Sequence, residues 1–176
     1  MGTRTLMTEA EFQRLPDDGN HHELDEGELI VMPPPVPRHG IVQVKVAAAL
    51  NSAAKGQGFV LTESGYRLAP GTVRGPDVSF ISEQRRPDFT WDRYCNFGPD
   101  LAVEILSPDD IARNLQRKIA QYLAAGTQIV WVLDPKSTTV TIYRRDAPFR
   151  TLGPDDTLDA PGVLPEFSVK VAALFE

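Results

Sequence analysis

One acidic residue interrupts an otherwise apolar stretch of the sequence, LAVEILSPDD at residues 101–110. Glu104 stands between Val103 and Ile105, in a segment that predicts a buried strand over residues 101–106. A buried carboxylate costs several kcal/mol unless it is paired with an opposite charge or binds a metal ion. The pattern therefore predicts a cation, either a side chain or a metal, in front of Glu104.

A second acid stands in a similar setting, in GPDVSFI at residues 75–81. Side-chain alternation puts Asp77 and Glu104 each on the face of its strand that is turned away from the neighbouring large apolar residues. If the strands are neighbours, the two carboxylates converge and repel each other unless a cation lies between them. Mg²⁺ is held by such a pair with backbone carbonyls and water. The alternatives are a turn acid at Asp77 and a structural ion pair at Glu104.

A lysine on the following helix is the third candidate. Ser107-Pro108-Asp109-Asp110 predicts the helix start, and Gly126 closes the helix after Ala125. Lys118 falls within the apolar stripe of this helix and is predicted to point toward the sheet, where its ammonium could reach both carboxylates. The alternative is a purely structural lysine that pairs with Glu104 or covers the core with its stem. The stripe consists of Ile111, Leu115, Ile119 and Tyr122.

Composition limits the possible classes of protein. The chain has 176 residues, 41% of them hydrophobic, which predicts one globular domain over residues 1–176. Its net charge of −6 argues against a tight, non-specific nucleic-acid binder. An enzyme whose carboxylates hold a cation that in turn meets phosphate remains compatible with this charge.

The remaining bulk features concern the cellular setting. Cys95 is the only cysteine, which excludes an intrachain disulfide and a cysteine-based zinc site. No apolar run is long enough to span a bilayer, and the first residues lack the apolar core of a secretory signal. We therefore expect a cytoplasmic protein that does not associate with membranes.

The order of elements predicts an α/β fold with a central mixed β-sheet flanked by helices, preceded by an N-terminal helix and a β-hairpin. Thr8 to Glu11 has capping-box spacing, and Asp25-Glu26-Gly27 joins the hairpin strands. In the helix after the proline-rich connector we expect Ile41, Val44 and Ala48, with Ala47 as a further candidate, to face inward. The other segments are a helix over 39–55, strands over 59–62, 66–69, 73–81, 128–133 and 139–144, a loop over 82–99 and a short apolar tail.

These motifs resemble a known family. Pro76-Asp77 followed by Glu104 in an apolar strand resembles the PD-(D/E)XK nuclease pattern, although Leu106 stands where that pattern has lysine. The chain is more closely similar to the Uma-two (Uma2) family of restriction-endonuclease-like proteins, which places its lysine on the next helix, at a position matched by Lys118. The matching pieces are HELDEGELIVMPPP (22–35), His39, GPDVSFI (75–81), PDLAVEILSPDD (99–110), Lys118-xxx-Tyr122-xxx-Gly126 and VWVLDP (130–135).

The resemblance implies a restriction-endonuclease-like fold and Mg²⁺-dependent cleavage of nucleic acid, with DNA as the expected substrate and Mn²⁺ as an alternative metal. Asp77, Glu104 and the backbone carbonyl of Ile105 would ligate the metal, and Lys118 would orient the attacking water or stabilise developing charge. A homodimer is expected, because two active sites are the simplest way to cut both strands of a duplex.

Further site residues follow from the same resemblance. Glu23 would complete the metal shell or hold a second ion, unless it is a surface carboxylate of the hairpin. His39 and Arg74 are candidate substrate contacts, although a histidine at a helix start is often structural. Two other readings stay open: a non-catalytic nucleic-acid or protein-interaction module that retains the nuclease fold, and a metal-dependent hydrolase of another phosphate ester.

Overall fold

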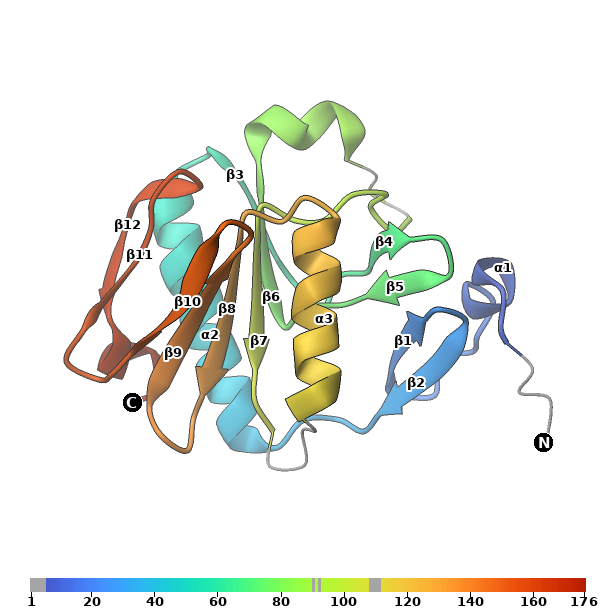
Figure 1. Cartoon of the computed structure of the whole chain (residues 1–176), viewed down its shortest axis with the longest axis horizontal. Helices are drawn as coiled ribbons and strands as arrows, with labels where there is room; N and C mark the ends of the chain where they lie inside the picture. The colour runs from blue at the N-terminus through green and yellow to red at the C-terminus, as the bar shows by residue number, and fades with distance from the viewer. Residues whose placement is uncertain (1–5, 90, 92, 108–111) are drawn as a thin grey trace.

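A six-stranded mixed sheet forms the centre of the computed structural model, with strand order β10-β9-β8-β7-β6-β3 (Figure 1). The structure describes residues 6–89, 91, 93–107 and 112–176. Strands β7 and β8 are parallel, whereas β6 pairs antiparallel with both β3 and β7. The strands are β3 (Gly58–Thr62), β6 (Val78–Ser82), β7 (Leu101–Ile105), β8 (Ile129–Asp134), β9 (Thr139–Arg144) and β10 (Ala147–Leu152).

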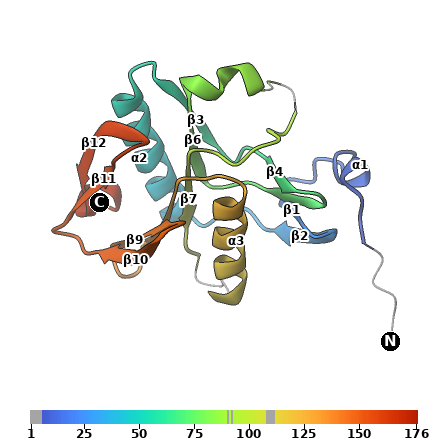
Figure 2. The same ribbon diagram turned by 45° about the horizontal axis from the view of Figure 1, so that its top comes forward.

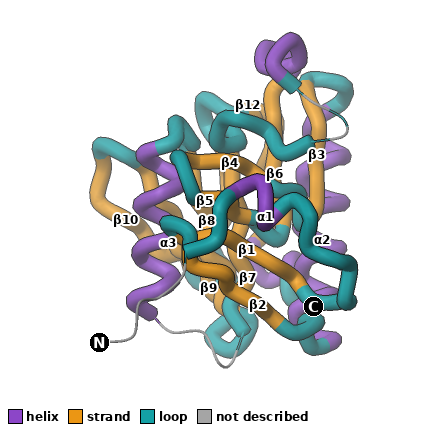
Figure 3. The backbone as a smooth tube through the Cα atoms, turned by 90° about the vertical axis from the view of Figure 1, so that its right-hand side faces the viewer, coloured by secondary structure: helices purple, strands orange, loops and turns teal. Residues whose placement is uncertain are grey.

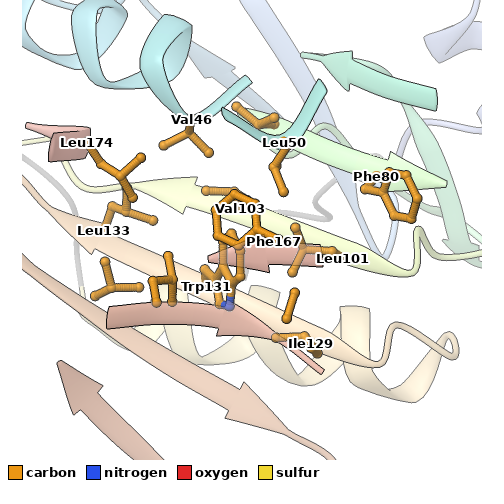
Figure 4. Packing of buried hydrophobic residues seen from close by; sticks show 14 of the residues in the cluster. Val46, Leu50, Phe80, Leu101, Val103, Ile129, Trp131, Leu133, Phe167 and Leu174 are labelled. Carbon is orange, nitrogen blue, oxygen red and sulfur yellow. The ribbon is translucent and has the colours of Figure 1, made fainter. Parts of the chain in front are cut away.

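Different elements cover the two faces of this sheet. Helix α2 (Pro37–Ala54) packs on one face with β11 (Thr157–Ala160), β12 (Leu164–Lys170) and the 3-10 helix η2 (Val171–Leu174). Figure 4 shows the core on this side, where Val46 and Leu50 of α2 lie over Val103. Helix α3 (Ala112–Ala124) packs on the other face through Ile119 and Tyr122.

A smaller sheet stands beside α3, with order β2-β1-β5-β4 (Figure 2). Figure 3, which views the molecule from this side, has the small sheet and α1 in front of the central strands. Phe12 of α1 packs against Leu24 and Val73 of the small sheet. The elements are α1 (Glu9–Phe12), β1 (His21–Asp25), β2 (Glu28–Met32), β4 (Tyr66–Ala69) and β5 (Thr72–Arg74).

The predicted α/β class is confirmed, with its central mixed sheet, flanking helices, N-terminal helix and hairpin. Thr8 and Glu11 form the reciprocal capping box. The predicted faces of the two central strands are also correct, because Val78 and Val103 lie in the same core cluster on the α2 side. Among the residues that the structure describes, no helix is long and apolar enough to cross a membrane.

The predicted inner face of α2 is wrong. Ile41 and Val44 are 53% and 69% exposed, and Ala48 is also exposed. The helix instead buries a neighbouring stripe that includes Val42 and Val46, and Ala47 is half-buried beside it. Both stripes have helical spacing, so spacing alone could not choose between them. The buried stripe also contains Leu50. Its polar members, His39 and Gln43, lie next to the site described below.

Other differences concern boundaries. Residues 73–81 form two strands in different sheets, because Gly75-Pro76 breaks the segment between β5 and β6. The expected loop over 82–99 begins with a 3-10 helix, η1 (Glu83–Asp88). The tail contains strands β10 to β12, which the sequence analysis did not predict. The predicted helix start at Pro108 and the stripe residue Ile111 lie outside the described residues.

Candidate active site

Asp77 directly precedes β6, and Glu104 lies in the neighbouring strand β7 of the central sheet. The antiparallel register pairs Val78 with Val103, so continuing it by one residue places Asp77 opposite Glu104. Oδ2 of Asp77 accepts a hydrogen bond from the backbone N–H of Ile105 at 2.6 Å. Directly opposed residues on adjacent strands have their Cβ atoms about 4.5–5.5 Å apart. The structure therefore brings the two predicted acids together on the α3 side of the sheet.

Lys118 joins these acids from α3. Its side chain is 13% exposed, and its Nζ lies 2.8 Å from Oε2 of Glu104 and 2.8 Å from Oε1 of Glu23. The helix presents Lys118 on the same side as the buried residues Ile119 and Tyr122, as its position in the apolar stripe predicts. The ammonium therefore lies between a strand of the central sheet and a strand of the small sheet.

Tyr122 completes the surroundings of Glu104. Its hydroxyl donates a hydrogen bond of 2.8 Å to Oε1 of Glu104, and the tyrosine is fully buried. Glu104 thus receives one donor at each oxygen, the phenol at Oε1 and Lys118 at Oε2. A carboxylate offers about four lone-pair positions, so these two bonds leave capacity for a further ligand.

Glu23 is a buried residue of β1, not a surface carboxylate of the hairpin. Its Oε1 accepts a hydrogen bond from the backbone N–H of Gly75 at 2.9 Å and forms an ion pair with Lys118, and its Oε2 accepts from Arg74 at 3.0 Å. Both oxygens are therefore occupied by donors, and the residue holds Lys118 from the side opposite Glu104.

Arg74 lies behind Glu23 and is only 3% exposed. Its Nη1 binds Glu23, its Nη2 lies 2.8 Å from Asp25, and its Nε donates to Gln121 of α3 at 2.8 Å. All three nitrogens of the guanidinium are thus bound to protein groups. Arg74 therefore links the small sheet to α3, and it is also one of the residues that line the cavity described below.

His39 stands at the first turn of α2 and is buried beside Asp77. Its Nε2 lies 3.3 Å from Oδ2 of Asp77, an ion pair when the imidazole is protonated. Gln43, one turn further along α2, donates to the backbone carbonyl of Asp77 at 3.0 Å. The first two turns of α2 therefore fix the position of Asp77.

The electrostatics of the cluster follow from burial and from the excess of acids. Burial raises the pKa of Glu104 to about 8, Lys118 opposes this shift, and the nearby Asp77 and Glu23 add to it. Burial alone would lower the pKa of Lys118, but the three surrounding carboxylates outweigh it and raise this pKa, so the ammonium stays charged. Burial and the charge of Glu104 also raise the pKa of Tyr122, which keeps its hydroxyl proton.

The cluster opens into a cavity of about 540 Å³ between the small sheet, α3 and the end of β7. Glu23, Asp77, Glu104 and Lys118 all line this cavity, as does His39. In Figure 1, α3 stands between the central sheet and the hairpin of β1 and β2. The volume lies within the roughly 300–1,000 Å³ of ligand sites in proteins.

The residue types fit a magnesium ion held by few protein ligands. No three His, Cys, Asp or Glu side chains in the described part of the chain stand close enough to hold a metal ion by themselves. Mg²⁺ commonly uses only one or two carboxylates and retains several water molecules. Asp77 and Glu104 are such a pair, and both face a cavity that can hold water.

The roles of two site residues were not predicted from the sequence. Tyr122 was placed in the apolar stripe, yet its hydroxyl binds Glu104. Gln121 was not singled out, yet it links Arg74 to Asp25 of β1 through hydrogen bonds of 2.8 and 2.7 Å. The signal for Tyr122 was its position four residues after Lys118, which puts both side chains on one face of the helix.

Comparison with known proteins agrees with this fold. The architecture is that of a restriction-endonuclease-like protein, a mixed sheet with flanking helices and an acidic pair at adjacent strands. The chain belongs to the Uma2 family, described as "putative restriction endonuclease", whose model matches residues 9–172. No curated protein matches the chain.

A solved structure shares the fold over nearly the whole chain. It is the crystal structure of a "putative nuclease belonging to DUF820" from Anabaena variabilis, with a TM-score of 0.87 and 27% sequence identity. The match covers 96% of this chain and 97% of the other. The family and this neighbour together support a nuclease function.

Proposed function

We propose that the protein is a Mg²⁺-dependent endonuclease that hydrolyses phosphodiester bonds in nucleic acid, with DNA as the first candidate substrate. The observation that carries this proposal is the position of Lys118. Its ammonium lies 2.8 Å from Glu104, inside a cavity that Asp77 also lines. A lysine and two acids that converge at one cavity are the groups that metal-assisted phosphodiester cleavage needs.

Asp77 and Glu104 would hold the metal ion, with the backbone carbonyl of Ile105 as a further oxygen ligand; Mn²⁺ suits the same oxygen donors. When bound, the ion supplies a Lewis acid for the scissile phosphate and lowers the pKa of a coordinated water. His39 and Gln43 keep Asp77 in place, and Tyr122 keeps Glu104 in place.

Lys118 would stabilise the negative charge that develops on the phosphate, or orient the attacking water. Its raised pKa keeps it protonated and unable to act as a base near neutral pH. Glu23 restrains the ammonium from the other side, and Arg74 restrains Glu23, so both serve as positioning residues for Lys118. The metal role that the resemblance implies for Glu23 and the substrate contact that it implies for Arg74 stay predictions beside this proposed positioning role.

The test is cleavage of plasmid and single-stranded DNA and of RNA at low salt, with Mg²⁺, with Mn²⁺ and with EDTA. Glu104→Gln keeps the shape of the side chain but weakens a metal ligand, so cleavage should fall at least about 100-fold. Glu166→Gln is the matched control, because the same change is made at an exposed residue of β12. Wild type and Glu104→Gln showing the same trace cleavage would favour the interaction module.

The assembly of the chain is also a proposal. We propose a homodimer, formed by a single domain over residues 1–176 and located in the cytoplasm. The exposed Ile41 and Val44 support a dimer, because they lie on α2 within residues 29–62, which contain no Asp or Glu. Two copies of an acidic chain can meet on such a surface without repulsion between carboxylates. A monomer in sedimentation equilibrium at micromolar concentration would contradict the dimer.

A further inference from the structure

The hairpin wall of the cavity combines charged and apolar side chains on one face. The antiparallel register of β1 and β2 pairs Glu23 with Ile30 and His21 with Met32. Directly paired residues share a face of the sheet, so Ile30 and Met32 stand beside the carboxylate that holds Lys118. Both apolar residues are half-buried and both line the cavity.

The side of the cavity that is formed by α3 and the end of β7 also combines charged and apolar side chains. Leu115 precedes Lys118 by three residues on α3, and Leu106 follows Glu104 by two residues at the end of β7, so each lies on the side of its charged neighbour. Both leucines are half-buried and both line the cavity. The cavity is therefore lined by aliphatic side chains from the hairpin and from the α3 and β7 side, together with the charged cluster.

The charged cluster is recessed in this cavity. Glu104 is 7% exposed and the Lys118 side chain is 13% exposed, and both line the cavity, so a phosphate meets them by entering the cavity. A base-paired nucleotide keeps its base stacked inside the duplex and offers only its sugar-phosphate edge, which would leave the apolar walls in contact with water. Enzymes that act on an extruded nucleotide hold its base between apolar or aromatic side chains.

We propose that this cavity binds one unpaired nucleotide, with its base between the Ile30–Met32 wall and Leu115 and its phosphate at the charged cluster. The substrate is then single-stranded nucleic acid, or a nucleotide that is unpaired within a duplex. The inference rests on the proposed nuclease function, and it adds the pairing state of the substrate. The cavity volume of about 540 Å³ suits a ligand of this size.

The first test compares three DNA substrates of one sequence: a single strand, a blunt duplex, and a duplex with a central unpaired bubble. With Mg²⁺, the single strand should be cleaved at least about tenfold faster than the duplex, and cuts in the bubble substrate should fall at its unpaired nucleotides. A duplex cleaved as fast as the single strand would overturn the inference while leaving the nuclease function intact.

The second test uses a matched pair of double variants on one strand. Ile30→Ala with Met32→Ala removes the apolar wall, whereas Leu29→Ala with Val31→Ala removes similar atoms from the opposite, exposed face of β2. The first pair should raise the KM for single-stranded DNA about tenfold, the scale of one lost base-stacking contact, with kcat little changed. The second pair should match the wild type, and equal behaviour of the two pairs would contradict the base-binding wall.

Binding separates failure of this inference from failure of the proposed function. Fluorescence anisotropy of a labelled single-stranded oligonucleotide, measured with Ca²⁺ in place of Mg²⁺, needs no turnover. If nothing is cleaved but the single strand binds more tightly than the duplex, and only the Ile30–Met32 pair of changes weakens binding, then the unpaired-nucleotide site stands and the nuclease proposal fails. Equal binding of single strand and duplex would overturn the inference directly.

Discussion

Strand β7 is bounded by two buried acids that do different work. Asp100 precedes the strand and is 3% exposed, and Glu104 lies near its other end. Asp100 accepts hydrogen bonds from the backbone N–H of Ser82, from Gln128 and from Arg85, at 2.8 to 3.1 Å. Each oxygen is satisfied by protein donors, and Asp100 ties β7 to the ends of β6 and β8.

The charges around Glu104 differ from those around Asp100, because carboxylates are in excess there. Its cation, Lys118, is shared with Glu23, and Asp77 adds a third carboxylate nearby. The cluster opens into the cavity, whereas Asp100 does not line it. Asp100 thus has a structural explanation, because protein donors satisfy both of its oxygens. Glu104 has a functional one, because three carboxylates share Lys118 beside a cavity. This excess of carboxylates is what a divalent ion would relieve.

Removing the cation at each end of β7 tests this difference most strongly. Lys118→Met should lower kcat about 100- to 1,000-fold, the scale of one lost electrostatic donor to a transition state. Arg85→Met removes the cation of Asp100 and should leave kcat within about twofold, while lowering the melting temperature by a few degrees. Cleavage of the single-stranded substrate and thermal unfolding measure the two effects. Equal losses of kcat would contradict the distinction between the two ends.

Neutralising one acid at each end sharpens the comparison through metal binding. Adding Mg²⁺ or Mn²⁺ at 100 times its dissociation constant should stabilise the wild type by about 2.7 kcal/mol. Asp77→Asn should abolish this gain in melting temperature. Asp100→Asn should cost about 1–3 kcal/mol of stability, because an amide N–H₂ then meets donors, yet it should retain the metal response. A metal response that survives Asp77→Asn would exclude Asp77 as a ligand.

Much of the central sheet could be predicted from the sequence, because its strands carry their own periodicity. Glu104 stood out as a charge within an apolar run, and Lys118 as a charge within an apolar stripe, so both were predicted to face the same space. The structure brings them to 2.8 Å. Local patterns suffice when the anomaly is a single charged residue in an apolar setting.

The remaining features depended on contacts distant in the chain. The predicted inner stripe of α2 was wrong, because the buried face is the one that meets partners later in the chain: Val42, Val46 and Leu50 pack in the central core, and His39 and Gln43 contact Asp77. The contacts of Arg74 also join residues far apart, Glu23 and Gln121. The sequence around Arg74 contains no pattern that predicts either partner. Arg74 is buried only because the small sheet packs beside α3.

The pH dependence of stability gives the smallest expected effect, and it concerns Glu104. The folded-state pKa of Glu104 lies above its ordinary value of 4.5, at about 8, so the folded protein binds this proton more tightly than the unfolded chain. The contribution of Glu104 to the free energy of unfolding therefore falls as pH rises from 4.5 to about 8. Lys118 adds no slope there, because its raised pKa keeps it protonated in both states.

Urea unfolding at pH 5, 6, 7 and 8, without divalent metal, measures the slope. Glu104→Gln should remove at least about 1 kcal/mol of the decline, and Asp100→Asn should leave this contribution in place. Parallel curves for the wild type and Glu104→Gln would mean that Lys118 compensates the burial of Glu104 completely, as in an ordinary structural ion pair.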